Sequence, residues 1–445
     1  MFLGILFLVV PSLSLPYSQR EANYRLLPVD VGDPAGKIKL IFANAVWRHG
    51  DRSPERQLPG DGTDKFSEDD WKFGGGGYGE LSPEGMAQQY MVGTKIAKRY
   101  MQQFQFLTKQ YRANEIYIQS TDYNRTLISA YSNLAGMYAG TAVPDSDFPS
   151  GVQGWPKGWV PVPVHTVVNK YDYVGNPDAE CKRKSQVKQM IINSDDFVAY
   201  KNDPTVKATL DWLSSHSKSS VTVENSYWFQ DTMTCEQFHQ TELGGANADA
   251  TTWYPWYFDG KVADITNTIV GKALDFQDGL ANPLGVKGID VSVEMPKMRA
   301  GETIGTIYGM IQGVLHCYKD PSSDECRKFY KNRKYFAISA HDKTVAALLT
   351  LLGPKKYVIP MGYPDYAAAM LIELYVEEGT DYEYFKVLYL ANPNVDDFVS
   401  VTNFVTGCPL TDEYCPLSVL TALVDKYTPK PDMDTYCNTD VFANQ

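Results

Sequence analysis

The chain has 445 residues, of which 44% are hydrophobic and 13% aromatic, so it can bury either two cores or one elaborated core. Its net charge of −12 argues against a nucleic-acid partner, because such a partner requires a basic surface. No cofactor is expected. A metal in particular is not expected, because the cysteines are better used in disulfides and the histidines show no ligand spacing: they are His49, His165, His216, His239, His316 and His341.

Residues 1–17 predict a secretory signal peptide. The apolar block 2–10 is followed by Pro11 and small residues, which is typical of such a peptide. A membrane anchor would need about 20 apolar residues, and Pro11 and Pro16 interrupt the block too early. We therefore expect a mature protein without a membrane span. Secretion is the main expectation, and a lysosomal or other lumenal location is the alternative.

The stretch 37–54 joins a buried strand to a cationic turn. Residues 38–46 are almost continuously apolar, which predicts a strand that is buried on both faces. The turn holds Arg48, His49 and Arg52. Gly50 allows close approach of the backbone, and two guanidinium groups beside an imidazole can hold a tetrahedral oxyanion such as phosphate.

A second strand and turn follow further along the chain. Ser82 and Pro83 predict the start of a helix within 79–111, and residues 115–119 predict a short strand. This strand leads into the turn 120–126 and then a helix, so Arg125 stands at a helix N-terminus, where backbone N–H groups favour an anion.

The α/β pattern is interrupted and then resumes. Between residues 144 and 298 only weaker helical patterns occur, such as 186–192 and 203–214. A helix is expected over 301–316, and the strand 334–340 ends at His341 and Asp342. Residues 369–375 and 384–390 predict two antiparallel strands, so the sheet should be mixed. Ligands of open α/β sheets bind beyond the carboxyl ends of the strands, where the three turns meet.

Three motifs together resemble the histidine acid phosphatases of the prostatic and lysosomal type, within the histidine phosphatase superfamily. They are Arg48-His49-Gly50-x-Arg52-x-Pro54, Ser120-Thr121-Asp122-x-x-Arg125-Thr126 and Ser339-Ala340-His341-Asp342-x-Thr344-Val345. The resemblance implies an α/β fold with a mixed, mainly parallel central sheet flanked by helices. This domain would consist of residues 22–150 and 300–445, with a mainly helical cap, residues 151–299, inserted between its two parts.

The resemblance also implies roles for the residues of the three motifs. His49 is expected to attack phosphorus through one ring nitrogen, while a hydrogen bond holds the other. Asp342 is expected to donate a proton to the leaving group, with its pKa raised by burial or by an anionic substrate. The expected phosphate-binding residues are Arg48, Arg52, Arg125 and His341, with His341 charged at acidic pH. The expected function is hydrolysis of phosphate monoesters at acidic pH. A phytase-like hydrolase of inositol phosphates and a secreted phosphate-binding or antigenic protein without turnover are the alternatives.

Seven cysteines in an oxidising compartment indicate disulfides with one thiol left over. With help from the resemblance, the expected pairs are Cys181–Cys437, Cys317–Cys326 and Cys408–Cys415, which leaves Cys235 free. The resemblance allows a homodimer. Asn124 begins the only Asn-x-Ser/Thr sequon, and we expect it to carry no glycan, because a glycan in this turn would crowd the phosphate site.

Overall fold

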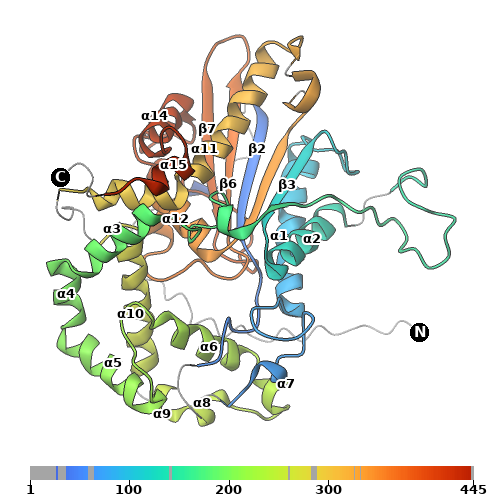
Figure 1. Ribbon diagram of the computed structural model, residues 1–445. Coiled ribbons are helices and arrows are strands. Elements are labelled where there is room, and N and C mark those ends of the chain that lie inside the picture. Colours follow the sequence, from blue (N-terminus) through green and yellow to red (C-terminus); the bar gives the residue numbers. More distant parts are fainter. Residues whose placement is uncertain are drawn as a thin grey trace.

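A computed structural model of the protein describes residues 27–28, 37–58, 65–139, 143–258, 261–281, 288–324, 326–330 and 332–441. The expected signal peptide lies outside these residues. A central sheet has helices against it, and a separate group of helices lies beyond one end of the sheet (Figure 1). Within the described ranges, no helix is long and apolar enough to cross a membrane.

The sheet is mixed, as the sequence predicts. Its strand order is β1-β8-β7-β6-β2-β5-β3-β4, with β9 beside β7. The neighbours β2, β5, β3 and β4 run parallel, whereas β6, β7 and β8 continue the sheet in antiparallel pairs. The strands are β1 (Leu27–Pro28), β2 (Ile38–Arg48), β3 (Ile116–Thr121), β4 (His165–Val167), β5 (Tyr335–Ala340), β6 (Ala369–Glu377), β7 (Glu383–Leu390), β8 (Val399–Ser400) and β9 (Cys415–Pro416).

Both faces of β2 are buried because its side chains alternate between two cores. Phe42 and Val46 belong to one core, together with residues of α11 (Val291–Lys319), α12 (Asp342–Leu352) and α14 (Leu417–Tyr427). Ala43 and Trp47 belong to the other, together with residues of α1 (Pro83–Ala97) and α2 (Asn124–Tyr138). The predicted two-sided burial of this strand is confirmed.

Two glycines let α1 and α2 pack with their backbones in contact. A Cβ atom on Gly93 would lie 2.0 Å from the carbonyl oxygen of Asn133, and one on Gly136 would lie 2.1 Å from that of Tyr90. Any larger residue would therefore push the two helices apart. This packing matters for function because α1 and α2 both begin beside the cationic turn.

A lobe of short helices follows β4 and lies away from the sheet (Figure 1). It has a core of its own, which also takes in Leu58 and residues of α15 (Met433–Asn438). Its helices are α3 (Lys182–Ile192), α4 (Asp195–Lys201), α5 (Pro204–Ser217), α6 (Tyr227–Phe238), α7 (Gln240–Gly244), α8 (Ala250–Trp253), α9 (Pro255–Phe258) and α10 (Val262–Gln277). The division of the chain near residues 150 and 300 stays a prediction.

The remaining elements are short. They are α13 (Lys355–Val358), the 3-10 turns η1 (Glu68–Asp70), η3 (Asn169–Tyr171) and η5 (Thr402–Phe404), and the π-helical turns η2 (Lys98–Gln103) and η4 (Cys326–Tyr330).

Two helix boundaries differ from the predicted ones, at the end of α1 and at the start of α11. The predicted cap is present, since the Ser82 hydroxyl accepts a hydrogen bond from the Gly85 N–H at 2.9 Å. Helix α1 continues directly into the π-helical turn η2, so the helical stretch ends at Gln103, short of residue 111. Helix α11 begins ten residues before the predicted start at 301, because Asp290 caps its first turn and Pro296 is accommodated inside it.

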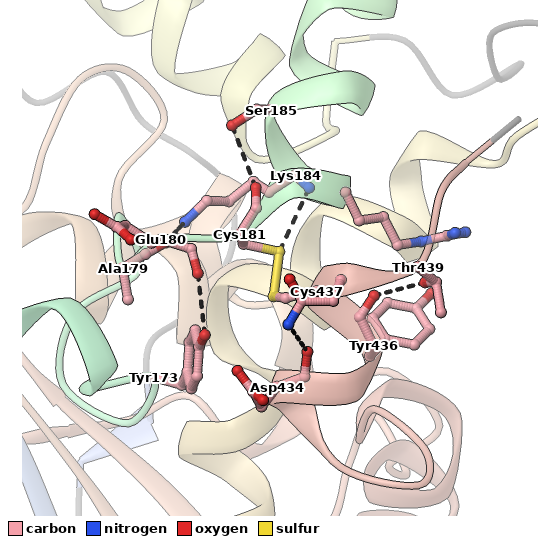
Figure 2. Close-up of a disulfide and its surroundings, with 12 residues drawn as sticks. Tyr173, Ala179, Glu180, Cys181, Lys184, Ser185, Asp434, Tyr436, Cys437 and Thr439 are labelled. Carbon is pink, nitrogen blue, oxygen red and sulfur yellow. Dashed lines mark hydrogen bonds between the residues drawn. A yellow bond between two sulfur atoms is a disulfide. The ribbon is translucent and has the colours of Figure 1, made fainter.

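Disulfides join segments that are far apart as well as close in sequence. Cys181 at the start of α3 is bonded to Cys437 in α15, so the C-terminal end of the chain is tied to the helical lobe (Figure 2). Cys317–Cys326 and Cys408–Cys415 close short loops. These are the pairs that the resemblance implies, and the remaining cysteine, Cys235, is buried in α6.

Candidate active site

Three parallel strands deliver the three motifs to one edge of the sheet. Strands β2, β5 and β3 are neighbours, and each leads at its carboxyl end into a motif turn. The rings of His49, after β2, and His341, after β5, lie 5.6 Å apart between centroids. Both line a pocket of about 670 Å³, together with Arg125 and Asp342.

The imidazole of His49 is held in one tautomer. Its Nδ1 lies 2.8 Å from the carbonyl oxygen of Gly50, which can only accept, so Nδ1 carries the proton and Nε2 has a free lone pair. The pKa of His49 lies well below its usual value, because burial disfavours the charged ring and the guanidinium groups of Arg125 and Arg48 repel a further positive charge. The surroundings of His49 therefore favour its neutral form, which is the form that a nucleophile requires.

Gly50 is required by the close packing of the turn on α1. A Cβ atom at this position would lie 2.2 Å from the carbonyl oxygen of Gly85. The Gly50 N–H donates to the hydroxyl of Ser129 in α2 at 3.2 Å. The starts of α1 and α2 thus fix the backbone that carries His49.

The three predicted phosphate-binding arginines are all buried, and each has a different partner. Arg48 donates from Nη1 to the carbonyl oxygen of Pro364 at 2.6 Å, and its Nη2 lies 3.2 Å from Oδ2 of Asp342. Arg125 donates from Nη2 to Oε1 of Glu55 at 2.9 Å. Arg52 is fully buried, and its guanidinium forms a two-pronged pair with Asp231 in α6. Arg48 and Arg52 are not among the side chains that line the pocket.

Each of these arginines has an N–H group that makes no hydrogen bond within the described residues. The buried Nε atoms of Arg48, Arg52 and Arg125 have no hydrogen-bond partner in the described part of the chain. A buried donor without an acceptor costs about 1–3 kcal/mol, so three of them near one histidine are not expected unless a ligand supplies acceptors. A tetrahedral oxyanion has the charge and the acceptors for this cluster.

His341 and Asp342 lie at the start of α12. Thr121 Oγ1 is 3.0 Å from His341 Nε2. Burial and the positive charge of Arg125 lower the pKa of His341 to about 3, so its ring is neutral over most of the acidic range, unlike the charged donor that we expected. A neutral ring can still donate one hydrogen bond to phosphate.

The carboxyl group of Asp342 responds to opposing influences. Burial raises its pKa, but the positive charges of Arg48 and Lys343 outweigh burial, and the pKa lies below its usual value. Burial, one of the two influences that we expected to favour a protonated Asp342, therefore does not prevail. The other influence is an anionic substrate, which would offset the same cations.

Sequence reasoning missed most of the pocket rim. The missed polar lining residues are Glu55, Tyr78, Glu80, Tyr123, Asn169, Lys170, Asn176, Asp178, Glu180, Tyr227 and Lys343. Tyr123 and Lys343 lie inside motifs and Glu55 adjoins one, so these three could have been suspected. Those from the helical lobe carry no sequence signal. Asn124 also lines the pocket and donates from Nδ2 to Oε1 of Glu80 at 3.0 Å. The absence of a glycan at this residue stays a prediction.

Comparisons with known proteins agree with this geometry. Residues 39–390 match the model of the histidine phosphatase superfamily (branch 2). The chain is 31% identical to "Putative acid phosphatase 10" of Caenorhabditis elegans, over 93% of this chain and 97% of that protein. It is 30% identical to human prostatic acid phosphatase, over 90% of this chain and 88% of that protein.

Solved structures show the same fold at lower identity. The Hafnia alvei phytase in complex with myo-inositol hexakis sulphate superimposes with a TM-score of 0.58 at 16% identity, over 92% of this chain and 100% of that chain. Since the superfamily model spans most of the sequence and the relatives match nearly end to end, this chain is a phosphatase that belongs to branch 2 of the histidine phosphatase superfamily.

Proposed function

We propose that the protein is an acid phosphatase that hydrolyses phosphate monoesters through a phosphohistidine at Nε2 of His49. The observation that carries this proposal is the His49 ring itself. Its Nδ1–H is held by the Gly50 carbonyl, and it lies among three buried arginines whose Nε–H groups have no acceptor among the described residues. Fixed positive charge around a neutral nucleophile is what phosphoryl transfer requires.

In the first step, Nε2 of His49 forms a bond to phosphorus while the bond from phosphorus to the ester oxygen breaks. Asp342 gives its proton to that oxygen, and the alcohol leaves. The dianionic phosphate offsets the charge of Arg48, which otherwise lowers the Asp342 pKa, so substrate binding favours the protonated acid. The need for a protonated Asp342 accounts for activity at acidic pH.

In the second step, water attacks phosphorus and the bond to Nε2 breaks. The carboxylate of Asp342, now deprotonated, accepts a proton from the water, and inorganic phosphate leaves. Arg48, Arg52 and Arg125 keep their charge throughout, because guanidinium groups do not titrate in this range.

The charge of the pocket rim favours simple monoesters over inositol polyphosphates. Among the described residues, six carboxyl groups but only three lysine or arginine side chains line the pocket. One of the three, Lys343, is already paired, since its Nζ lies 2.7 Å from Oδ2 of Asp178. Glu80, Asp122 and Glu180 would repel the additional phosphates of a polyphosphorylated substrate.

Two assays test the proposal. Purified protein should hydrolyse an aryl phosphate at acidic pH with much higher kcat/KM than inositol hexakisphosphate. The reverse preference would support the phytase-like alternative. Phosphate binding without turnover of either substrate would show that the protein binds phosphate but is not an enzyme.

We also propose a secreted or lumenal location. Three disulfides support it, because such bonds persist in oxidising compartments. The homodimer that the resemblance allows stays a prediction, which light scattering of the purified protein would test.

A further inference from the structure

Helix α6 of the helical lobe contacts the catalytic turn at a residue that the three motifs do not include. Asp231 is 7% exposed and accepts two hydrogen bonds from Arg52, from Nη1 to Oδ2 at 3.1 Å and from Nη2 to Oδ1 at 2.9 Å. Its Oδ2 also accepts from the backbone N–H of Glu55 at 3.2 Å. One buried carboxylate thus fixes both the guanidinium and the turn that follows it.

The donors of Arg52 are almost all taken by the protein. Besides the two bonds to Asp231, Nη1 donates to the carbonyl oxygen of Ser53 at 2.9 Å, and Nη2 donates to the Tyr227 hydroxyl at 3.2 Å. A guanidinium has five N–H donors, and these contacts use the four terminal ones. The Nε–H remains, and it is buried without an acceptor in the described part of the chain.

The pair also sets the charge beside the nucleophile. Arg52 is one of the cations that lower the pKa of His49, and Asp231 is the strongest of the charged groups that raise the pKa of Arg52. With Asp231 in place, Arg52 acts as a fixed donor whose charge has a buried partner.

We propose that Asp231 is a positioning residue, which holds Arg52 so that only its Nε–H binds the transferring phosphoryl group. This inference rests on the proposed function. It also assigns a role in catalysis to the helical lobe, since α6 supplies both Asp231 and Tyr227.

The test is a double-mutant cycle in the full-length protein with nitrophenyl phosphate as substrate. Asp231→Asn keeps the shape of the side chain but replaces one carboxylate oxygen by an NH2 group. This group cannot accept a hydrogen bond from Arg52, so one of the two bonds is lost. We expect kcat to fall about 10- to 100-fold, while the inhibition constant of inorganic phosphate rises by no more than about threefold. Asp211→Asn, which breaks an exposed ion pair in α5, is the matched control and should leave both constants unchanged.

The cycle separates positioning from a merely structural role. If Asp231 acts through Arg52, then Asp231→Asn combined with Arg52→Gln should lose no more activity than Arg52→Gln alone. Losses that multiply in the double variant would overturn the inference.

A milder variant keeps the inference testable if Asp231→Asn does not fold. Tyr227→Phe removes a single acceptor from Nη2 of Arg52 and should lower kcat a few fold, but not in the Arg52→Gln background. An equal loss in both backgrounds would contradict the inference. Failure of the proposed function would look different, because the wild-type protein would then not turn over nitrophenyl phosphate at all.

Discussion

Two groups of buried arginine side chains differ in how their donors are used. In the antiparallel half of the sheet, Arg99 donates from Nε and Nη2 to the two carboxylate oxygens of Glu373 on β6, at 2.6 and 2.7 Å. The hydroxyls of Tyr100 and Tyr375 donate to the same carboxylate, each at 2.7 Å. At the parallel edge, each of the three motif arginines retains a buried Nε–H for which the described ranges of the chain offer no acceptor.

The difference separates structural charge from charge that serves a ligand. A buried ion pair with its hydrogen bonds completed is self-contained, and removing one partner leaves the other charge uncompensated. A buried arginine with an unused donor costs stability in the protein but can bind an anion strongly. Changes at Glu373 should therefore affect folding, whereas changes around His49 should affect activity.

The largest effect on activity is expected from His49→Ala. Turnover should fall at least about a thousandfold, because no other group supplies the nucleophile. Binding of phosphate or vanadate, measured by calorimetry, should persist, because the arginines remain. His316→Ala, which removes an imidazole outside the pocket, is the control. Residual activity clearly above about 0.1% would mean that another residue attacks phosphorus.

Asp342→Asn should have an effect that depends on the leaving group. An alkoxide cannot leave without a proton, whereas a nitrophenolate nearly can, and a general acid is typically worth about a hundred- to ten-thousandfold. Single-turnover rates should thus fall severely for alkyl phosphates and much less for nitrophenyl phosphate. Equal losses would show that Asp342 only orients its neighbours.

The two arginine clusters can be compared directly by their effects on stability. Glu373→Gln should lower the free energy of unfolding by about 3–5 kcal/mol, because Arg99 is left buried and uncompensated. Burial and Arg52 lower the pKa of Arg125, so its charge is disfavoured in the fold, and Arg125→Gln should lose activity with little loss of stability. Denaturant unfolding of both variants measures this. Equal destabilisation would remove the distinction between the clusters.

The smallest effect concerns the pH profile. Lys343 lowers the pKa of Asp342, so in Lys343→Gln the acid should stay protonated to higher pH. The alkaline limb of kcat/KM should move upwards, whereas in Lys207→Gln, an exposed control on α5, it should stay in place. A shift towards lower pH would mean that another group controls this limb.

Local patterns in the sequence predicted the parts of the site that lie at strand ends. Continuous apolar residues revealed β2, and the motif turns after β2, β3 and β5 located His49, Arg125 and His341. Once the strands are parallel neighbours, these turns must meet at one edge.

The contacts between distant segments could not be predicted in this way. Asp231 is one acidic residue on a helix with no distinguishing pattern, and it meets Arg52 across 179 positions of sequence. The low pKa of His341 likewise depends on burial and on Arg125, which only the assembled fold brings to it. Tertiary packing decides both.

The central claim is that His49 is the nucleophile through Nε2, and trapping the phosphoenzyme tests it most directly. In Asp342→Asn, nitrophenyl phosphate should still phosphorylate the enzyme, while hydrolysis of the intermediate slows, because its water lacks a base. After an alkaline quench, mass spectrometry should find one phosphate on Nε2 of His49, because Nδ1 is held by the Gly50 carbonyl. Phosphate on Nδ1, or on any other residue, would contradict the account.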